Sequence, residues 1–186
     1  DKPHPAFLED GISEETMKKF EIMYYDKSNR IVIPHRHHET GEIIGLKSRS
    51  LNFEDIDKGF KYIPMKIQEV SYSYPTFQNL YGLYQNKEMI KRLRKVVIFE
   101  SEKSVMQFES FFPNQNFSVA LCGSNISKLQ VEMLLDLGVK KIFLEVRQNN
   151  LPARALYQKL GFSDISVRKN YYPDGENAVV MAKELL

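Results

Sequence analysis

The fold is decided by three short apolar runs, Val96-Val-Ile-Phe99, Phe117-Ser-Val-Ala-Leu121 and Lys141-Ile-Phe-Leu-Glu-Val146. Two segments with helical patterns, 102–112 and 126–137, lie between them. Short continuous apolar runs are typical of strands that are buried on both faces of a sheet. The order strand, helix, strand, helix, strand at this spacing predicts crossover connections and a parallel sheet. The sequence therefore predicts an α/β protein.

Smaller elements are predicted on both sides of this stretch. Upstream, Ser13 can cap a helix within residues 12–23, and two strands at 31–33 and 43–46 form a hairpin around the turn at 39–41. Downstream we expect a helix capped by Asn149 or Asn150, a chain reversal at Gly161 and two final strands. The ranges expected for this downstream part are 150–160 for the helix and 163–169 and 177–184 for the strands.

Composition excludes several classes of protein. The chain has 186 residues, of which 42% are hydrophobic and 27% charged, and a formal net charge of +2. No run approaches the roughly 20 apolar residues that a membrane-spanning helix needs, so we expect no membrane partner. The single cysteine, Cys122, cannot form an internal disulfide; it favours a cytoplasmic location and is expected to be an inert small apolar residue. The charge by itself argues neither for nor against nucleic acid.

A set of local motifs occurs in one particular order between residue 5 and about residue 144. It includes Arg30-Ile-Val-Ile-Pro34, Ser48-Arg49, Leu80-Tyr-Gly-Leu83, Val97-Ile-Phe-Glu-Ser-Glu-Lys103 and Ala120-Leu-Cys-Gly-Ser124. In this order and spacing the chain resembles the catalytic core of DnaG-type bacterial and phage primases. The resemblance covers the amino-terminal core subdomain and the first half of the Toprim domain of those enzymes.

The primase resemblance implies a nucleic-acid function with named residues. Glu100 is implied as the catalytic glutamate and as a ligand of Mg²⁺ or Mn²⁺, at the carboxyl end of the first parallel strand. Arg49, Lys61 and Lys103 are implied to approach nucleotides or template. The implied partners are single-stranded DNA and nucleotides, and the implied activity is DNA-directed synthesis of RNA primers. The alternative for the three basic residues is solvated surface charge.

The sequence departs from the primase pattern at the metal site. The Asp-x-Asp pair of that family aligns with Arg147 and Asn149, so a cation and an amide replace two carboxylates. Repulsion between Arg147 and a divalent cation opposes metal binding there. We therefore expect primer synthesis to be impaired.

A second resemblance begins in the third apolar run. The motif Asn150-x-x-Ala-x-x-x-Tyr157-x-x-x-Gly-Phe162, within residues 144–186, is similar to GNAT acetyltransferases that modify the amino termini of ribosomal proteins. It implies acetyl-CoA as cosubstrate, Asn150 as a cofactor contact and Tyr157 as the acid that protonates the departing thiolate. The alternative for Tyr157 is a core-facing aromatic residue. The glycine-rich pyrophosphate loop of that family is not found; Gly123-Ser-Asn-Ile-Ser127 is the nearest glycine-containing helix start.

Both resemblances meet between Leu144 and Glu145, which suggests a chimera. We expect three parts: a primase-like core subdomain at 1–95, the first half of a Toprim-like domain at 96–144, and a GNAT-like fragment at 145–186. The expected fold is an α/β Toprim-like parallel sheet with flanking helices, preceded by a small α+β subdomain and completed by a helix–strand–strand tail. Three hypotheses stay open: a primase-type protein, a GNAT-type N-acetyltransferase, and a folded chimera without activity. The oligomeric state is open.

Three further features have simpler explanations. The histidines of His35-Arg-His-His38 suggest zinc, but no cysteine lies nearby in the sequence and the cluster sits in a hairpin turn, so a structural zinc site is disfavoured. A basic run before the first parallel strand is better explained as a solvated helix end than as a phosphate contact. An aromatic string between residues 72 and 84 is expected to pack on the sheet rather than to stack bases. The basic run consists of Lys91, Arg92, Arg94 and Lys95. The aromatic string consists of Tyr72, Tyr74, Phe77, Tyr81 and Tyr84.

Overall fold

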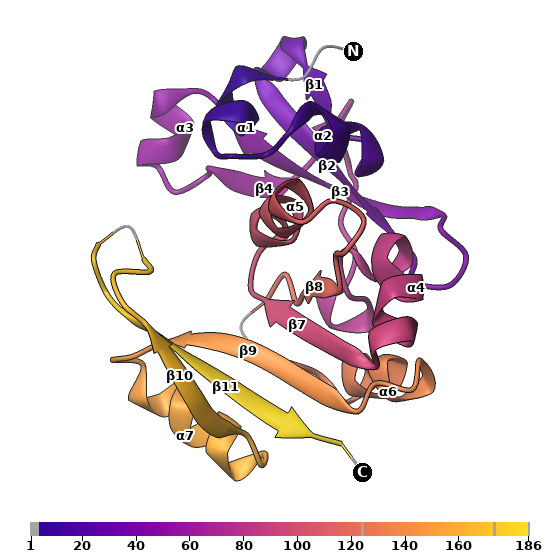
Figure 1. Cartoon of the computed structure of the whole chain (residues 1–186). Coiled ribbons are helices and arrows are strands. Elements are labelled where there is room, and N and C mark those ends of the chain that lie inside the picture. Colours follow the sequence, from indigo (N-terminus) through magenta and orange to yellow (C-terminus); the bar gives the residue numbers. More distant parts are fainter. Residues whose placement is uncertain (1–3, 124, 173, 186) are drawn as a thin grey trace.

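The computed structural model describes residues 4–123, 125–172 and 174–185. The fold is mixed α/β, as predicted, with a four-stranded and a two-stranded sheet in the amino-terminal half and a larger, five-stranded sheet in the carboxyl-terminal half (Figure 1). The strands are β1 (Met23–Tyr25), β2 (Arg30–Arg36), β3 (Ile43–Ser50), β4 (Tyr62–Pro64), β5 (Lys66–Ile67), β6 (Val70–Ser71), β7 (Lys95–Phe99), β8 (Ser118–Ala120), β9 (Lys141–Arg147), β10 (Ser163–Arg168) and β11 (Ala178–Glu184). The helices are α1 (Pro5–Glu9), α2 (Glu14–Lys19), α3 (Phe53–Asp57), α4 (Leu83–Leu93), α5 (Glu102–Phe111), α6 (Lys128–Asp136) and α7 (Leu151–Lys159), with short 3₁₀ turns η1 (Asp26–Ser28) and η2 (Thr76–Gln78).

The larger sheet has the strand order β10-β11-β9-β7-β8. Its centre is parallel, because β7 pairs in parallel with both β8 and β9, and α5 and α6 make the two crossovers. Strands β11 and β10 are antiparallel additions, and β11 pairs with β9 along its whole length, from Arg147 to Lys141. The helix–strand–strand tail thus completes the same sheet that the three apolar runs begin, as the sequence predicted.

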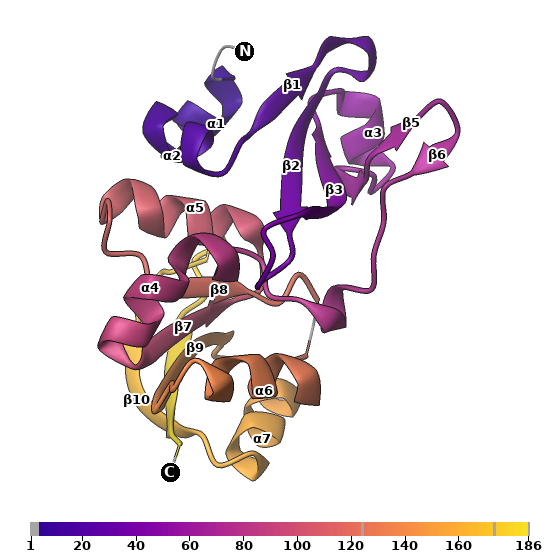
Figure 2. The ribbon, with the colours of Figure 1, turned by 90° about the vertical axis from the view of Figure 1, so that its right-hand side faces the viewer.

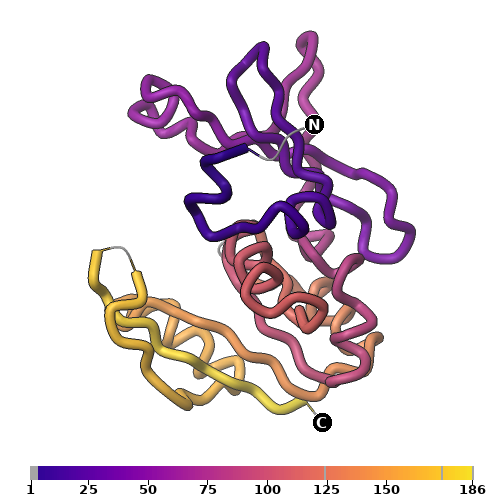
Figure 3. The backbone as a smooth tube through the Cα atoms, turned by 45° about the horizontal axis from the view of Figure 1, so that its top comes forward, coloured from indigo at the N-terminus to yellow at the C-terminus, as the bar shows by residue number. Residues whose placement is uncertain are grey.

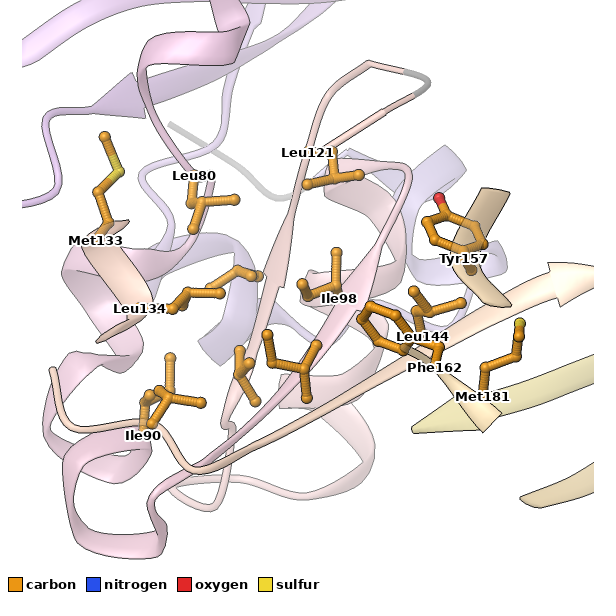
Figure 4. Close-up of a cluster of buried hydrophobic side chains, with 14 of the residues drawn as sticks. Leu80, Ile90, Ile98, Leu121, Met133, Leu134, Leu144, Tyr157, Phe162 and Met181 are labelled. Atoms are coloured by element: carbon orange, nitrogen blue, oxygen red, sulfur yellow. The ribbon is translucent and has the colours of Figure 1, made fainter. Parts of the chain in front are cut away.

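Two hydrophobic cores lie on opposite faces of this sheet. On one face, α5 lies between the larger sheet and the four-stranded sheet β1-β2-β3-β4 (Figures 1 and 2). On the other face, α4, α6 and α7 cover the strands, and their side chains pack with Ile98, Leu144 and Met181 (Figure 4). The core under α5 is built mainly from Phe7, Phe20, Ile31, Ile33, Val105 and Met106.

The ends of the helices follow from local chemistry. Ser13 caps α2 by accepting a hydrogen bond from the Thr16 backbone N–H, and Asn150 caps α7 by accepting one from Ala153. The sequence left Asn149 or Asn150 open for the second cap, and the structure selects Asn150. Gly161 follows α7 with a φ of +86°, a left-handed conformation that glycine adopts at little cost.

The two ends of the described chain lie at opposite ends of the molecule (Figure 3). The amino-terminal helices rest on the four-stranded sheet, and the carboxyl-terminal strand β11 ends beside β9. None of the helices in the described part of the chain has the length and apolar character that crossing a bilayer requires.

Candidate functional site

A pocket opens where two parallel strands of the larger sheet stop pairing. Strands β7 and β9 pair as far as Ile98 and Leu144. Beyond this point β9 continues beside β11, whereas β7 stays with the segment after β8, because Leu121 N donates to Phe99 O at 3.0 Å. The carboxyl ends of these strands therefore separate, at the edge where open α/β sheets place their ligands.

The pocket brings together residues that the sequence assigned to two different functions. Glu100, the implied primase glutamate, and Tyr157, the implied acetyltransferase acid, both line it. Its other polar group is Glu145, which the sequence did not single out for this site. The apolar lining consists of Ile98, Phe99, Leu121, Ile126, Leu144 and Phe162, and Figure 4 shows Ile98, Leu144, Tyr157 and Phe162 close together.

Tyr157 is held by packing on α7. It is 9% exposed, and its ring meets that of Phe162 edge-on at a centroid distance of 5.8 Å. Burial raises the pKa of the Tyr157 hydroxyl, and the nearby Glu100 carboxylate raises it further. The phenol consequently keeps its proton near neutral pH, which is the state of a general acid.

The two carboxylates of the pocket have different surroundings. Glu100 is exposed and makes no ion pair within the described ranges. Glu145 is largely buried and lies 2.9 Å from the Arg168 guanidinium. The pocket thus contains one free carboxylate and one that a cation already balances.

The positions aligned with the primase aspartates form a network of their own. Arg147 Nη1 lies 2.8 Å from Asp174 and 2.6 Å from Glu176, and the Asn149 backbone N–H donates to Glu176. The guanidinium also stacks over the Tyr172 ring. No group of three carboxylate, imidazole or thiol ligands surrounds Glu100 in the part of the chain that the structure describes. The ligand geometry for a divalent cation at Glu100 is therefore incomplete.

The implied nucleic-acid contacts lie in the amino-terminal half and on α5. Arg49 and Lys103 converge on Asp10, at 2.9 Å and 3.0 Å from its two carboxylate oxygens. Lys61 is exposed, and its backbone carbonyl accepts a hydrogen bond from Ser50 N. Two of the three cations are thus internally paired, while the third faces solvent.

The residue implied to contact acetyl-CoA already makes a hydrogen bond within the protein. The Asn150 side chain serves as the helix cap described above. Of the glycine-containing segment before α6, Ser124 lies outside the described residues, Ile126 lines the pocket, and Ser127 caps α6. Thus α6 starts beside the pocket.

A buried ion pair beneath the four-stranded sheet was not foreseen from the sequence. Lys47 Nζ contacts the Glu102 carboxylate at 2.8 Å, and His35 Nε2 lies 3.1 Å from the same group. Burial by itself would raise the pKa of Glu102, but the contacts with His35 and Lys47 outweigh it and lower the pKa to about 2. These residues meet only after β2, β3 and α5 have packed together.

Comparison with known proteins gives two kinds of similarity. The model of the GNAT acetyltransferase family matches residues 125–162. The [ribosomal protein bS18]-alanine N-acetyltransferase of Haemophilus influenzae is 35% identical over 122 residues, which cover 61% of this chain and 82% of that protein. An SPbeta prophage-derived uncharacterized protein of Bacillus subtilis, YorJ, is 43% identical over 152 residues, covering 81% of this chain and 40% of that protein.

The structural similarity is to a primase. The crystal structure of the Aquifex aeolicus primase, comprising its zinc-binding and RNA polymerase domains, matches with a TM-score of 0.67 at 20% identity. The match covers 84% of this chain and 45% of that one, so the chain spans less than half of the prophage relative and of this primase. At this identity the likeness concerns the fold.

Fold and pocket together define a mixed α/β protein with a primase-like core and a site at the carboxyl ends of its parallel strands. By its sequence similarity to the bS18-alanine acetyltransferases, the chain belongs to the GNAT acetyltransferase family. The family match begins at residue 125, so the acetyltransferase similarity extends upstream of the predicted join between Leu144 and Glu145. The prediction that it is confined to residues 144–186 was wrong.

Proposed function

We propose that this chain transfers an acetyl group from acetyl-CoA to an amine in the pocket between β7 and β9. The observation that supports this proposal is the meeting of Glu100 and Tyr157 in one pocket. Family membership implies acetyl-CoA as the cosubstrate. A carboxylate and a protonated phenol are the base and acid that acyl transfer from a thioester requires.

The proposed step assigns one proton transfer to each group. Glu100 accepts a proton from the attacking neutral amine as the amine nitrogen forms a bond to the acetyl carbonyl carbon. The carbon–sulfur bond breaks, and the Tyr157 hydroxyl protonates the departing thiolate. The raised pKa of Tyr157 keeps this proton in place until the thiolate forms. Asn150 is proposed as a cofactor contact, in addition to its observed role as the α7 cap.

The test combines binding and transfer with the full chain. Calorimetric titration with acetyl-CoA measures binding, and mass spectrometry measures acetylation of a peptide that begins with alanine, the residue named for the Haemophilus relative. We expect Tyr157→Phe and Glu100→Gln to lower transfer by about 10²- to 10⁴-fold while binding changes little. Tyr24→Phe, on β1, is the matched control. A flat titration at millimolar acetyl-CoA would contradict the proposal.

A second candidate is a primase-type function, and the fold match over 84% of the chain favours it. In this case the primase-like part binds single-stranded DNA and nucleotides through Arg49, Lys61 and Lys103, with Mg²⁺ or Mn²⁺ at Glu100. Primer synthesis is impaired because Arg147 and Asn149 replace the aspartates. This candidate expects thermal stabilisation by either metal that Glu100→Gln abolishes, and binding of single-stranded DNA at low salt.

Two broader predictions accompany these candidates. The division into parts at 1–95, 96–144 and 145–186 remains a proposal, as does a cytoplasmic location. The third hypothesis is a folded chimera without activity. It is supported if the chain binds none of the three ligands: acetyl-CoA, a divalent metal and single-stranded DNA.

A further inference from the structure

A largely buried cluster of three metal-ligand types lies outside the pocket lining. His35 from β2, Glu102 at the start of α5 and Cys122 after β8 place a nitrogen, an oxygen and a sulfur atom within 4.8 Å of one another. His35 and Glu102 are each 2% exposed. Within the described ranges, no other group of three such side chains comes this close. The cluster joins segments that are 67 and 20 residues apart in the sequence.

The histidine is oriented as a metal ligand requires. Its Nδ1 lies 2.7 Å from the Tyr74 hydroxyl, which holds the ring from one side. Its Nε2 is buried, faces Glu102 at 3.1 Å, and has no hydrogen bond of good geometry in the described part of the molecule. A ligating histidine ordinarily uses one ring nitrogen for the metal and hydrogen-bonds the other, and this arrangement leaves Nε2 for the metal.

A groove connects the cluster with solvent. It has a volume of about 210 Å³, and His35, Lys47 and Cys122 line it together with Tyr62, Tyr72 and Tyr74. The Lys47 side chain is 28% exposed and reaches from this groove to the Glu102 carboxylate. The Lys47 ammonium group therefore neutralises the Glu102 carboxylate where a metal cation would otherwise bind. The flexible Lys47 side chain allows this ammonium group to move toward solvent.

The ligand set discriminates between metals. Mg²⁺ and Ca²⁺ prefer six or more oxygen ligands, whereas one imidazole, one carboxylate and one thiolate suit Zn²⁺. Three protein ligands leave a fourth position for water or a solute, and the groove leads to that position. We propose that His35 Nε2, the Glu102 carboxylate and Cys122 Sγ bind one Zn²⁺, with Lys47 displaced toward the groove and the Cys122 thiol deprotonated. This site is separate from the acetyl-CoA pocket and does not depend on the proposed acetyl transfer.

The test uses Co²⁺ as a spectroscopic substitute for Zn²⁺. The full chain, treated with a chelator and a reductant, is titrated with Co²⁺ and then with competing Zn²⁺. We expect one Co²⁺ per chain, visible absorption typical of four-coordination, and a thiolate charge-transfer band that Zn²⁺ abolishes. Cys122→Ser should remove the charge-transfer band, and His35→Gln should weaken binding at least tenfold.

Two controls separate this site from adventitious binding by the hairpin histidines. His37→Gln and His38→Gln, in the same hairpin, should leave the spectrum unchanged. Tyr74→Phe should lower affinity by about 10- to 100-fold, the usual effect of losing a group that orients a ligand. A spectrum without a thiolate band, or one that the His37 or His38 substitution removes, would overturn the proposal.

A measurement on the unaltered chain guards against variants that fail to fold. Cys122 is the only cysteine in the sequence, so its reaction with iodoacetamide is read directly from the intact mass. We expect Zn²⁺ to slow this reaction at least tenfold and Mg²⁺ to leave it unchanged. An alkylation rate that is the same with and without Zn²⁺ contradicts the proposal independently of any variant.

Discussion

Arg147 shows how one residue changes the chemistry of a site. Its guanidinium stands where a primase aspartate aligns, yet it is bonded to Asp174 and Glu176 on the loop before β11. A backbone N–H from Asn149 and the guanidinium lower the pKa of Glu176, and a backbone N–H from Glu176 and the guanidinium lower that of Asp174. The residue therefore stabilises a turn of the tail and presents a cation, not a carboxylate, at this position.

This network predicts a pH dependence of stability. Because the folded-state pKa values lie below the ordinary 4.5 and 3.8, the two carboxyls contribute stability above those values and lose it as the pH falls through the folded values. We expect Arg147→Met to lower the urea midpoint at pH 7, and this difference to shrink at pH 3. An equal difference at both pH values would show that the charges are irrelevant. Lys169→Met, at an exposed side chain of the same tail that makes no ion pair within the described residues, is the matched control and should leave the midpoint unchanged at both pH values.

The hydroxyl of Tyr81 is buried without a hydrogen-bond partner among the described residues. The side chain is 1% exposed and lies in the core under α5. Leaving a buried hydroxyl unpaired costs free energy. We expect Tyr81→Phe to raise the free energy of unfolding by about 1 kcal/mol, measured as a higher urea midpoint with an unchanged slope. A drop of similar size would reveal a partner such as a bound water.

Among the elements, α6 is fixed at its start by polar contacts rather than by its apolar face alone. Ser127 and Gln130 form a capping box, and the Gln130 side chain donates to the carbonyls of Asn79 and Thr76. Ser127 Oγ also donates to the Phe77 carbonyl at 2.7 Å. These bonds tie α6 to the turn η2, which precedes it by about fifty residues, and hold the helix start beside the pocket.

The capping box leads to a prediction about this helix. Gln130 is 1% exposed, so Gln130→Ala leaves buried backbone carbonyls without donors and removes the box. We expect a loss of about 2 kcal/mol in the free energy of unfolding. Lys128→Ala, at a side chain 92% exposed on the same helix, should change it by less than about 0.5 kcal/mol. Equal effects of the two substitutions would refute the importance of the box.

At the scale of the whole molecule, the tail and the parallel strands share one hydrophobic core. Tyr157, Phe162, Val179 and Met181 from the tail pack in the same cluster as Ile98 and other strand residues. Because β9 lies between β7 and β11, the sheet runs without interruption from the parallel strands into the tail. The two family resemblances therefore meet inside one continuous sheet and one hydrophobic cluster.

This continuity predicts the behaviour of fragments. A chain ending at residue 144 loses β11, the second half of β9 and the apolar cover from α7. We expect it to lack a cooperative thermal transition and to expose apolar surface, while the full chain unfolds in a single transition. Calorimetry and dye binding on both chains check this. A sharp transition in the 1–144 fragment would show that the primase-like part is an independent domain.

Local patterns predicted most of the elements but missed some. The apolar runs, the caps at Ser13 and Asn150 and the hairpin were foreseeable because each depends on neighbouring residues only. Of helix α4, only its end, within the basic run at residues 91–95, was predicted; its apolar positions pack on β7 and β8 only after the sheet has formed. The implied roles of Glu100, Arg49, Lys61, Lys103, Asn150 and Tyr157 stay predictions.

The sequence by itself determined the α/β class, the parallel strands and the absence of a carboxylate pair after β9, because these depend on periodicity and residue identity along short stretches. Only the tertiary structure decided which distant side chains meet. It placed Glu100 with Tyr157 where β7 and β9 separate, and His35 with Glu102 and Cys122 beneath the hairpin. Such meetings depend on how elements pack across the chain, since residues 20 to 90 positions apart become neighbours only when their strands and helices share a core.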